Sequence, residues 1–135
     1  MKYNRFEDLP VWKAALRLAV EVYRLTNDPF FSQAGDLKSQ LRRAALSVSD
    51  NIAEGFERGS TAELLAFIYI ARGSAGEVRS MLHFVGHFKK GDHLKSQIFR
   101  SEIACRVVFA AASRMGGQFA KFGHQGAATS DGSVA

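Results

Sequence analysis

Apolar residues in the middle of the chain recur at strictly alternating spacings of four and three. The series is Leu64, Ile68, Ala71, Ala75, Val78, Leu82 and Val85. This spacing puts every member on one face of a long α-helix and is typical of the seam between helices in a bundle. A chain built around such a segment is expected to fold as packed helices rather than as a sheet.

Two further segments with a helical period precede this one. The first is predicted from about Leu9 to Asn27, with Pro10 in its first turn, where the missing N–H costs nothing. The second is predicted from Leu37 to about Arg58, with Asp36 as its N-cap. Gly59 is the residue expected to end it.

The long third helix and a fourth follow without a large gap. Ser60-Thr61-Ala62-Glu63 reads as a capping box that starts the third helix, which is predicted to reach about Phe88. Asp92 is expected to cap the fourth helix, and the apolar seam of that helix makes Cys105 a buried core residue. Four helices joined by short turns predict an all-α, antiparallel, up-down-up-down four-helix bundle.

The length of 135 residues allows one domain, which we assign to residues 1–122. Residues 123–135 are rich in Gly, Ala and Ser and are expected to form a flexible C-terminal tail. The single cysteine excludes an intramolecular disulfide, and the N-terminus lacks the apolar stretch of a signal peptide. Charged residues interrupt every apolar run, so the sequence predicts a cytoplasmic protein with no membrane partner.

The net charge of +5 is unevenly distributed along the chain. Residues 1–58 hold nine Lys and Arg against eight Asp and Glu, whereas residues 59–121 hold nine against four. Such an excess can attract a polyanion such as RNA or DNA, or an acidic protein partner, although solvated basic residues would look the same. The candidate nucleic-acid-binding residues are Arg72, Arg79, Lys89, Lys90, Lys95 and Arg100.

The third helix carries a second set of apolar residues outside its seam. Leaving several such side chains exposed would forgo roughly 1.5 to 3 kcal/mol each, so they indicate self-association. The alternative is that the first and fourth helices wrap around both faces. The candidate oligomer interface comprises Phe67, Ile70, Ser74, Met81, Phe84 and Phe88.

The second helix shows the converse pattern, a polar stripe at spacings of three and four. Its members are Gln40, Arg43, Ser47, Asn51, Glu54 and Arg58. A solvated surface explains such a stripe, and so does a polar network at a subunit contact or a ligand-binding surface.

A search for chemical motifs yields little. His83 and His87 are four apart on one helical face, a spacing that can hold zinc, but no HExxH pattern accompanies them. No Glu is followed three residues later by His, as a di-iron bundle needs, and there is no GxxxxGK[ST], GxGxxG or GxSxG. We therefore expect neither an enzyme nor a bound metal or cofactor.

Several blocks resemble a known family. The chain has Phe6-Glu7-Asp8-Leu9 before Val11-Trp12-Lys13, Gln40 to Ala45 before Ser47-Val48, Asn51-Ile52-Ala53-Glu54-Gly55, and Ile70-Ala71-Arg72-Gly73-Ser74 with Glu77. Over about residues 6–115 it is similar to the 23S rRNA intervening-sequence proteins, also called the four-helix-bundle family. The polar residues and glycines that match the family motif are Arg43, Ser47, Asn51, Glu54, Gly55, Gly73, Ser74 and Glu77.

The resemblance implies a four-helix bundle that forms a ring-shaped homo-oligomer, typically a pentamer, without known catalytic activity. Some relatives are accessory proteins of diversity-generating retroelements, which resemble basic barrels that bind nucleic acid and a reverse transcriptase. Two functions follow as hypotheses. The first is weak, sequence-independent binding of RNA or DNA by a homo-oligomer, and the second is a structural or adaptor ring that recruits a protein. A small-molecule or enzymatic role would need pocket residues that the sequence does not nominate.

Overall fold

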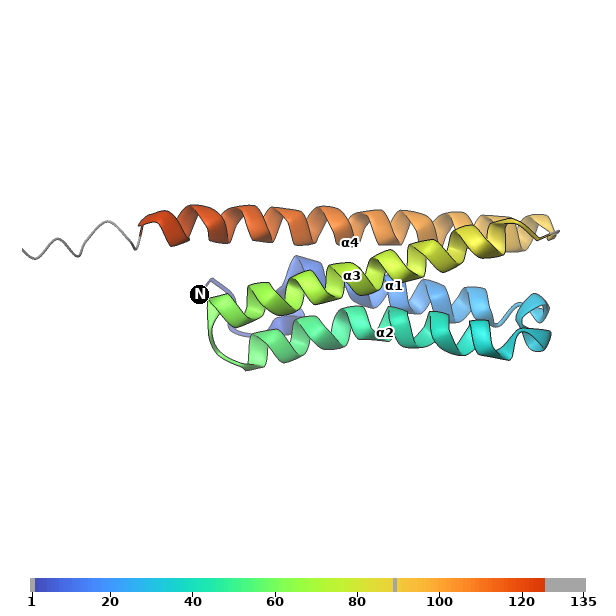
Figure 1. The fold of residues 1–135 in the computed structure, drawn as a ribbon, viewed down its shortest axis with the longest axis horizontal. Coiled ribbons are helices and arrows are strands. Elements are labelled where there is room, and N and C mark those ends of the chain that lie inside the picture. Colours follow the sequence, from blue (N-terminus) through green and yellow to red (C-terminus); the bar gives the residue numbers. More distant parts are fainter. Residues whose placement is uncertain (1, 89, 126–135) are drawn as a thin grey trace, which may run out of the picture.

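The computed structural model describes residues 2–88 and 90–125. Over these residues the protein is all-α, with four α-helices, two short 3-10 helices and no strand (Figure 1). The elements in chain order are η1 (Phe6–Asp8), α1 (Pro10–Thr26), η2 (Pro29–Gln33), α2 (Gly35–Glu57), α3 (Thr61–Gly86) and α4 (Asp92–Gln125).

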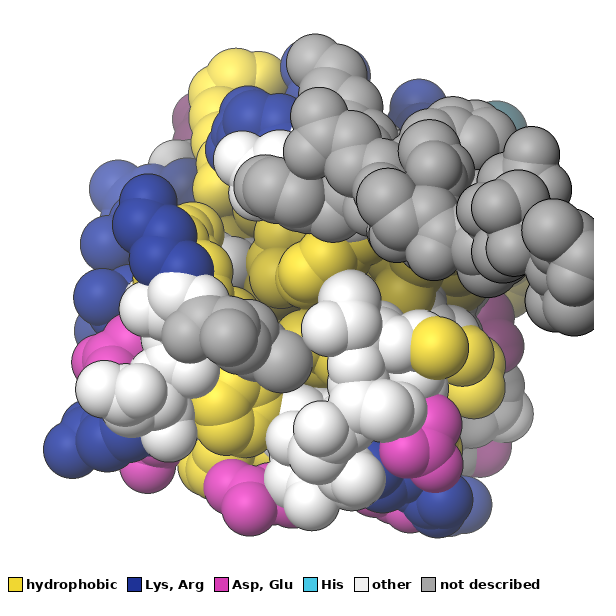
Figure 2. Space-filling view, turned by 90° about the vertical axis from the view of Figure 1, so that its left-hand side faces the viewer, with side chains coloured by type: hydrophobic (Ala, Val, Ile, Leu, Met, Phe, Trp, Pro, Cys, Tyr) yellow, Lys and Arg dark blue, Asp and Glu magenta, His cyan; other side chains and the backbone are white. Residues whose placement is uncertain are grey.

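The four α-helices pack around one apolar core, in an arrangement where each helix contacts two others. α1 lies against α2 and α4, and α3 lies against the same two helices. Within the described residues, the diagonal pairs α1–α3 and α2–α4 make no contact, so the α1–α4 side of the molecule is opposite the α2–α3 side. Viewed end-on in Figure 2, hydrophobic side chains occupy the centre between these sides.

The core contains the seams that the helical periods predict. All seven members of the α3 series, from Leu64 to Val85, are buried. In α4, Ser101 and Cys105 are completely buried, and Ser101 satisfies its hydroxyl by donating to the carbonyl of Gln97 at 2.9 Å. The periodicity therefore located the buried face of α3 and, at Cys105, that of α4.

The helix ends differ from the sequence predictions by one to three residues. α2 begins at Gly35 after Ala34 as N-cap, so Asp36 is in the first turn rather than at the cap, and its carboxylate there interacts favourably with the helix dipole. Asp92 is likewise the first residue of α4 instead of its cap. α3 ends at Gly86, two residues early, and α4 includes residues 123–125, which we had assigned to the tail. The remaining tail, 126–135, lies outside the described residues.

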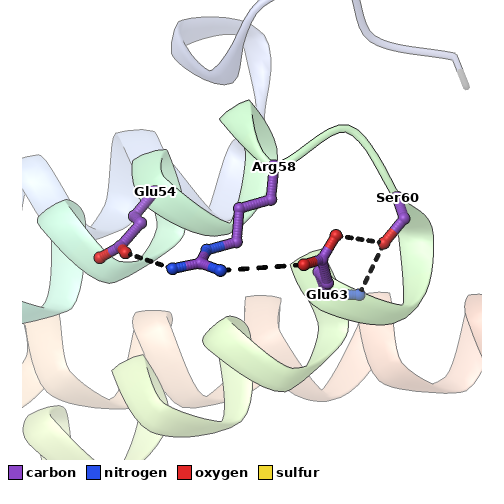
Figure 3. Close-up of polar contacts among 4 residues, drawn as sticks. All are labelled: Glu54, Arg58, Ser60 and Glu63. Atoms are coloured by element: carbon purple, nitrogen blue, oxygen red, sulfur yellow. Dashed lines mark hydrogen bonds and ion pairs between the residues drawn. The ribbon is translucent and has the colours of Figure 1, made fainter.

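The turn between α2 and α3 depends on a glycine and a capping box (Figure 3). Gly59 has φ = 85°, a left-handed conformation that a side chain disfavours, and it follows the last turn of α2. Ser60 Oγ accepts from the Glu63 backbone N–H at 3.2 Å. The Glu63 carboxylate does not bond the Ser60 backbone as in the expected capping box but accepts a hydrogen bond from the Ser60 hydroxyl at 2.7 Å. It also lies 3.8 Å from the Arg58 guanidinium, and Arg58 pairs with Glu54 at 3.0 Å.

A second polar cluster ties the end of α1 to α2. The buried hydroxyl of Thr26 donates to the carbonyl of Val22 at 2.8 Å and accepts from Arg42 Nε at 2.8 Å. Arg42 also donates to Asn27 Oδ1 at 3.0 Å and lies over the Tyr23 ring, 4.3 Å from its centre. Arg42 therefore fixes the α1–α2 packing, a role that the polar pattern of α2 did not indicate.

Among the described residues, none of the helices combines the length with the apolar character needed to cross a bilayer.

Candidate functional site

The predicted nucleic-acid-binding residues do not gather into one patch. Arg72 and Arg79 lie two turns apart on α3, beside α4. The Arg72 guanidinium is over the Phe109 ring of α4, 5.3 Å from its centre. Burial raises the pKa of the Cys105 thiol to about 12, and the positive charge of Arg79 opposes this shift. Arg79 therefore lies near Cys105, in the middle part of α4.

The other four candidates have separate surroundings. Lys90 Nζ donates to the carbonyls of Gly86 and Phe88 at 2.7 and 3.0 Å, so it serves the C-terminal end of α3. Lys95 pairs with Asp92 at 3.7 Å in the first turn of α4. Arg100 lines a groove between α1 and α4, on the opposite side of α4 from Phe109. Lys89 lies outside the described residues.

Helical spacing adds two residues of α4 to Arg72 and Arg79. Lys95 precedes Phe109 by fourteen residues and Arg106 precedes it by three, so both lie on or beside the side of α4 that faces α3. We call Arg72, Arg79, Lys95 and Arg106 the basic band. It runs along the α3–α4 side of the molecule, and Arg79 and Arg106 are exposed there.

The polar stripe of α2 forms a hydrogen-bonded contact with α3. Ser47 Oγ is 3.1 Å from Ser74 Oγ, and Asn51 Nδ2 donates to Ser47 Oγ at 2.9 Å and to the Ser47 carbonyl at 2.7 Å. Because Ser47 Oγ accepts from Asn51, its own hydrogen can point to Ser74. These hydrogen bonds lie within one chain, between α2 and α3, and the two alternatives of a subunit contact and a ligand-binding surface stay predictions for the α2 stripe.

Other residues of the α2 stripe line a shallow hollow of about 420 Å³ on the surface. Its walls come from α2 alone: Arg43, Leu46, Ser47, Asp50, Asn51 and Glu54. The hollow presents basic, acidic and amide groups together, and Arg58 at the end of the stripe is held in the α2–α3 turn.

The glycines of the family motif have different surroundings. A Cβ on Gly55 would lie 2.5 Å from Phe67 Cβ, so the absence of a side chain there permits the close approach of α2 and α3. Gly73 is exposed, and a Cβ placed on it would meet nothing within 4 Å. Glu77, one turn further on, is also exposed.

The six residues of the predicted oligomer interface divide into two groups. Ile70, Phe84 and Phe88 are about half exposed, at 52, 55 and 46%. Ser74 is buried against Ser47, which corrects its assignment to an outer surface. Phe67 and Met81 are partly covered and pack against the core. Part of the cover of Phe67 comes from Gly55 and Arg58 at the end of α2.

A second apolar surface escaped the sequence analysis. Leu16 and Val20 of α1 and Ile103 and Val107 of α4 line a groove of about 500 Å³ between the two helices. All four side chains are 41 to 44% exposed, and Phe99, one turn before Ile103, is 61% exposed. The pairs are four residues apart and lie outside the seams, so the spacing signal that identified the α3 face was present here too.

Three histidines lie at the end of α3 and the start of α4. His83, His87 and His93 are exposed. In the part of the chain that the structure describes, no three His, Cys, Asp or Glu side chains come together in a way that could hold a metal ion.

Cys105 is expected to be inert to thiol reagents until the protein unfolds. With a pKa of about 12 instead of 9.0, the folded thiol has a thiolate fraction about a thousandfold lower at pH 8. Labelling by a chromogenic disulfide should therefore be complete in guanidinium chloride and far slower without it. Because the thiol ionises at lower pH in the unfolded chain than in the folded one, ionisation favours unfolding at high pH. The contribution of Cys105 to the free energy of unfolding is therefore fully present below pH 9 and lost between about pH 9 and 12. Equal labelling rates would contradict the buried position.

Fold and surfaces together define an all-α protein of four helices, with polar groups tying α2 to α3 and with basic and apolar residues on its surface. The family model of the 23S rRNA-intervening sequence protein matches residues 7–106, and the chain belongs to this family. No curated protein matches the sequence.

Proposed function

We propose that this protein is a non-enzymatic, antiparallel up-down-up-down four-helix bundle of the cytoplasm that assembles into a cyclic homo-oligomer, a pentamer as the resemblance implies. The assembly binds RNA or DNA weakly and without base specificity. The observation that carries this proposal is the basic band on the α3–α4 side, in a chain that belongs to the 23S rRNA-intervening sequence protein family.

The connections between successive helices alternate between the two ends of the molecule, which supports the proposed up-down-up-down topology. In Figure 1 the α1–α2 and α3–α4 connections lie at one end of the molecule and the α2–α3 connection lies at the other. Half-exposed Ile70, Phe84 and Phe88 support self-association, because an apolar patch of this kind is usually covered by a partner.

Charge supports the choice of nucleic acid as ligand. Arg and Lys bind phosphate oxygens without reading bases. The four basic residues of the band outnumber its acidic neighbours on α4, which are Asp92, paired with Lys95, and Glu102. The non-enzymatic part of the proposal rests on the absence of a nucleophile or nucleotide motif in the sequence and on Cys105, whose raised pKa and burial remove it as a nucleophile.

An anisotropy titration with labelled single- and double-stranded RNA and DNA tests the binding. We expect affinity at 50 mM salt for several unrelated sequences, and a linear fall of log K with log salt, since each phosphate contact releases counterions. No binding to any polynucleotide at low salt would reject nucleic acid as the ligand. Recovery of a stoichiometric protein partner in nuclease-treated pull-downs would then favour the adaptor role.

A mass measurement in solution tests the assembly separately. Light scattering should give a multiple of 14.8 kDa, five copies for the pentamer. A monomer at tens of micromolar would overturn the proposed self-association.

A further inference from the structure

Two apolar surfaces are left uncovered by the residues that the structure describes. The first is the α3 outer face, which we define by Ile70, Phe84 and Phe88. The rings of Phe84 and Phe88 are 5.3 Å apart, and Phe30 lies 5.8 Å from Phe88, so the aromatic residues form a connected patch. The second is the α1–α4 groove, lined by Leu16, Val20, Ile103 and Val107.

The two surfaces lie on opposite sides of the molecule. Ile70, Ser74, Glu77, Met81, Phe84 and Phe88 follow one another at spacings of four and three, so they form one stripe along α3. Ser74 in this stripe contacts Ser47 of α2, which puts the stripe on the α2–α3 side. That side is opposite the α1–α4 groove, because α1 contacts α2 and α4 but not α3 within the described residues.

The two surfaces also carry different charges. The rim of the groove has Arg17, Arg24 and Arg100 against Glu21, and Glu21 pairs with Arg24 at 3.2 Å. The α3 outer face has Glu77 between Ile70 and Phe84, seven residues from each. The neighbouring hollow of α2 holds Asp50 and Glu54 together with basic Arg43, and Glu54 pairs with Arg58 at 3.0 Å. Figure 2 shows several Lys and Arg side chains along the left edge of the end view and others at its top and lower right.

These features determine how two copies can meet. Pairing the groove with itself would bring its basic rims together, and pairing either surface with itself would leave the other apolar surface exposed. A head-to-tail contact between unlike surfaces covers both and matches their charges. Gly73 adds a steric reason: a glycine in a helix interior costs about 0.5 to 1 kcal/mol relative to alanine, and no described residue lies within 4 Å of the Cβ position beside it.

We infer that the α1–α4 groove of one copy receives the α3 outer face of the next. This inference rests on the proposed self-assembly and specifies its contact. Repeated around a ring, the contact uses the α1–α4 and α2–α3 sides of every copy. The α3–α4 side, with the basic band, stays uncovered on one wall of the ring.

Mixing two blocked variants tests the contact. Phe84→Asp blocks the α3 outer face and keeps the groove, whereas Ile103→Asp blocks the groove and keeps the α3 outer face. Each alone is expected to have the monomer mass of 14.8 kDa. Mixed in equal amounts, they retain one matching pair of surfaces and should form a 1:1 complex of twice that mass.

Different results identify different errors. If the wild type is a monomer, the proposed self-assembly itself fails. If the wild type is an oligomer but the two variants do not combine, or if either variant alone forms a stable dimer, the head-to-tail contact is wrong. Ile70→Asp and Leu16→Asp block the same two surfaces and replace either variant that loses its helical circular dichroism.

A neighbouring substitution supplies the matched control. Tyr69 is 53% exposed and adjacent to Ile70, but its hydroxyl lies 3.2 Å from the Cβ position of Gly116 on α4, outside both surfaces. Tyr69→Asp should keep the wild-type mass, whereas Ile70→Asp should not. Loss of assembly in both would show that the effect is not specific to the α3 outer face and would count against the inference.

Discussion

Replacing Gly55 by alanine is expected to lower the free energy of unfolding by about 1 to 3 kcal/mol, the usual cost of overpacking a core. The added methyl would lie 2.5 Å from Phe67 Cβ and 3.3 Å from the backbone of Leu64. Neither atom is the end of a flexible side chain, so α2 and α3 must move apart. This separation would also stretch the Ser47–Ser74 contact.

Gly76→Ala is the matched control. It makes the same change in the interior of α3, where the new Cβ would be 3.8 Å from Phe109, an ordinary contact. Alanine should there stabilise the helix by about 0.5 to 1 kcal/mol through its better propensity. Chemical denaturation measures the free energy of unfolding of both variants. All samples are kept at one protein concentration, because assembly makes the apparent stability depend on concentration. Equal effects of the two substitutions would disprove the close approach at Gly55.

Neutralising two residues of the basic band, Arg79→Gln with Arg106→Gln, is expected to weaken polynucleotide binding about a hundredfold at 50 mM salt, roughly tenfold for each lost phosphate contact. Both side chains are exposed, so the fold should be unaffected. The slope of log K against log salt should fall in magnitude by about two, about one for each residue.

The control for this pair is Lys13→Gln with Arg43→Gln, which removes the same charge from exposed positions on α1 and α2. It lowers the net charge equally but leaves the basic band intact. If both double variants lose the same affinity, binding follows net charge alone, and the assignment of the α3–α4 side is wrong.

The sequence was most informative where one periodic signal dominated. The four-three spacing from Leu64 to Val85 predicted a buried seam, and all of these residues are buried, because a helix with one continuous apolar face has only one way to remove it from water. Helix ends were less accurate. Asp36 and Asp92 look like N-caps by residue type, but a carboxylate is also favourable inside the first turn.

The surfaces were predictable only in part, because exposure depends on which neighbours cover a helix. Ser74 and Phe84 belong to one apolar-rich stripe in the sequence, yet α2 covers the first and leaves the second exposed. The groove between α1 and α4 was missed because its residues come from helices far apart in the chain. Charge alone puts Arg72 and Arg100 in one predicted binding set. In the structure Arg72 lies against Phe109 on one side of α4, and Arg100 lines the groove on the other side.

Under the proposed function, the position of the basic band has a consequence for the length of nucleic acid that the ring would bind. One copy would offer only a few phosphate contacts and therefore weak affinity. In a head-to-tail ring every copy turns its α3–α4 side to the same wall, so a strand that reaches several copies binds through all of them at once. Affinity should then rise steeply once an oligonucleotide is long enough to bridge adjacent copies. The protein would thus select its nucleic acid by length rather than by sequence.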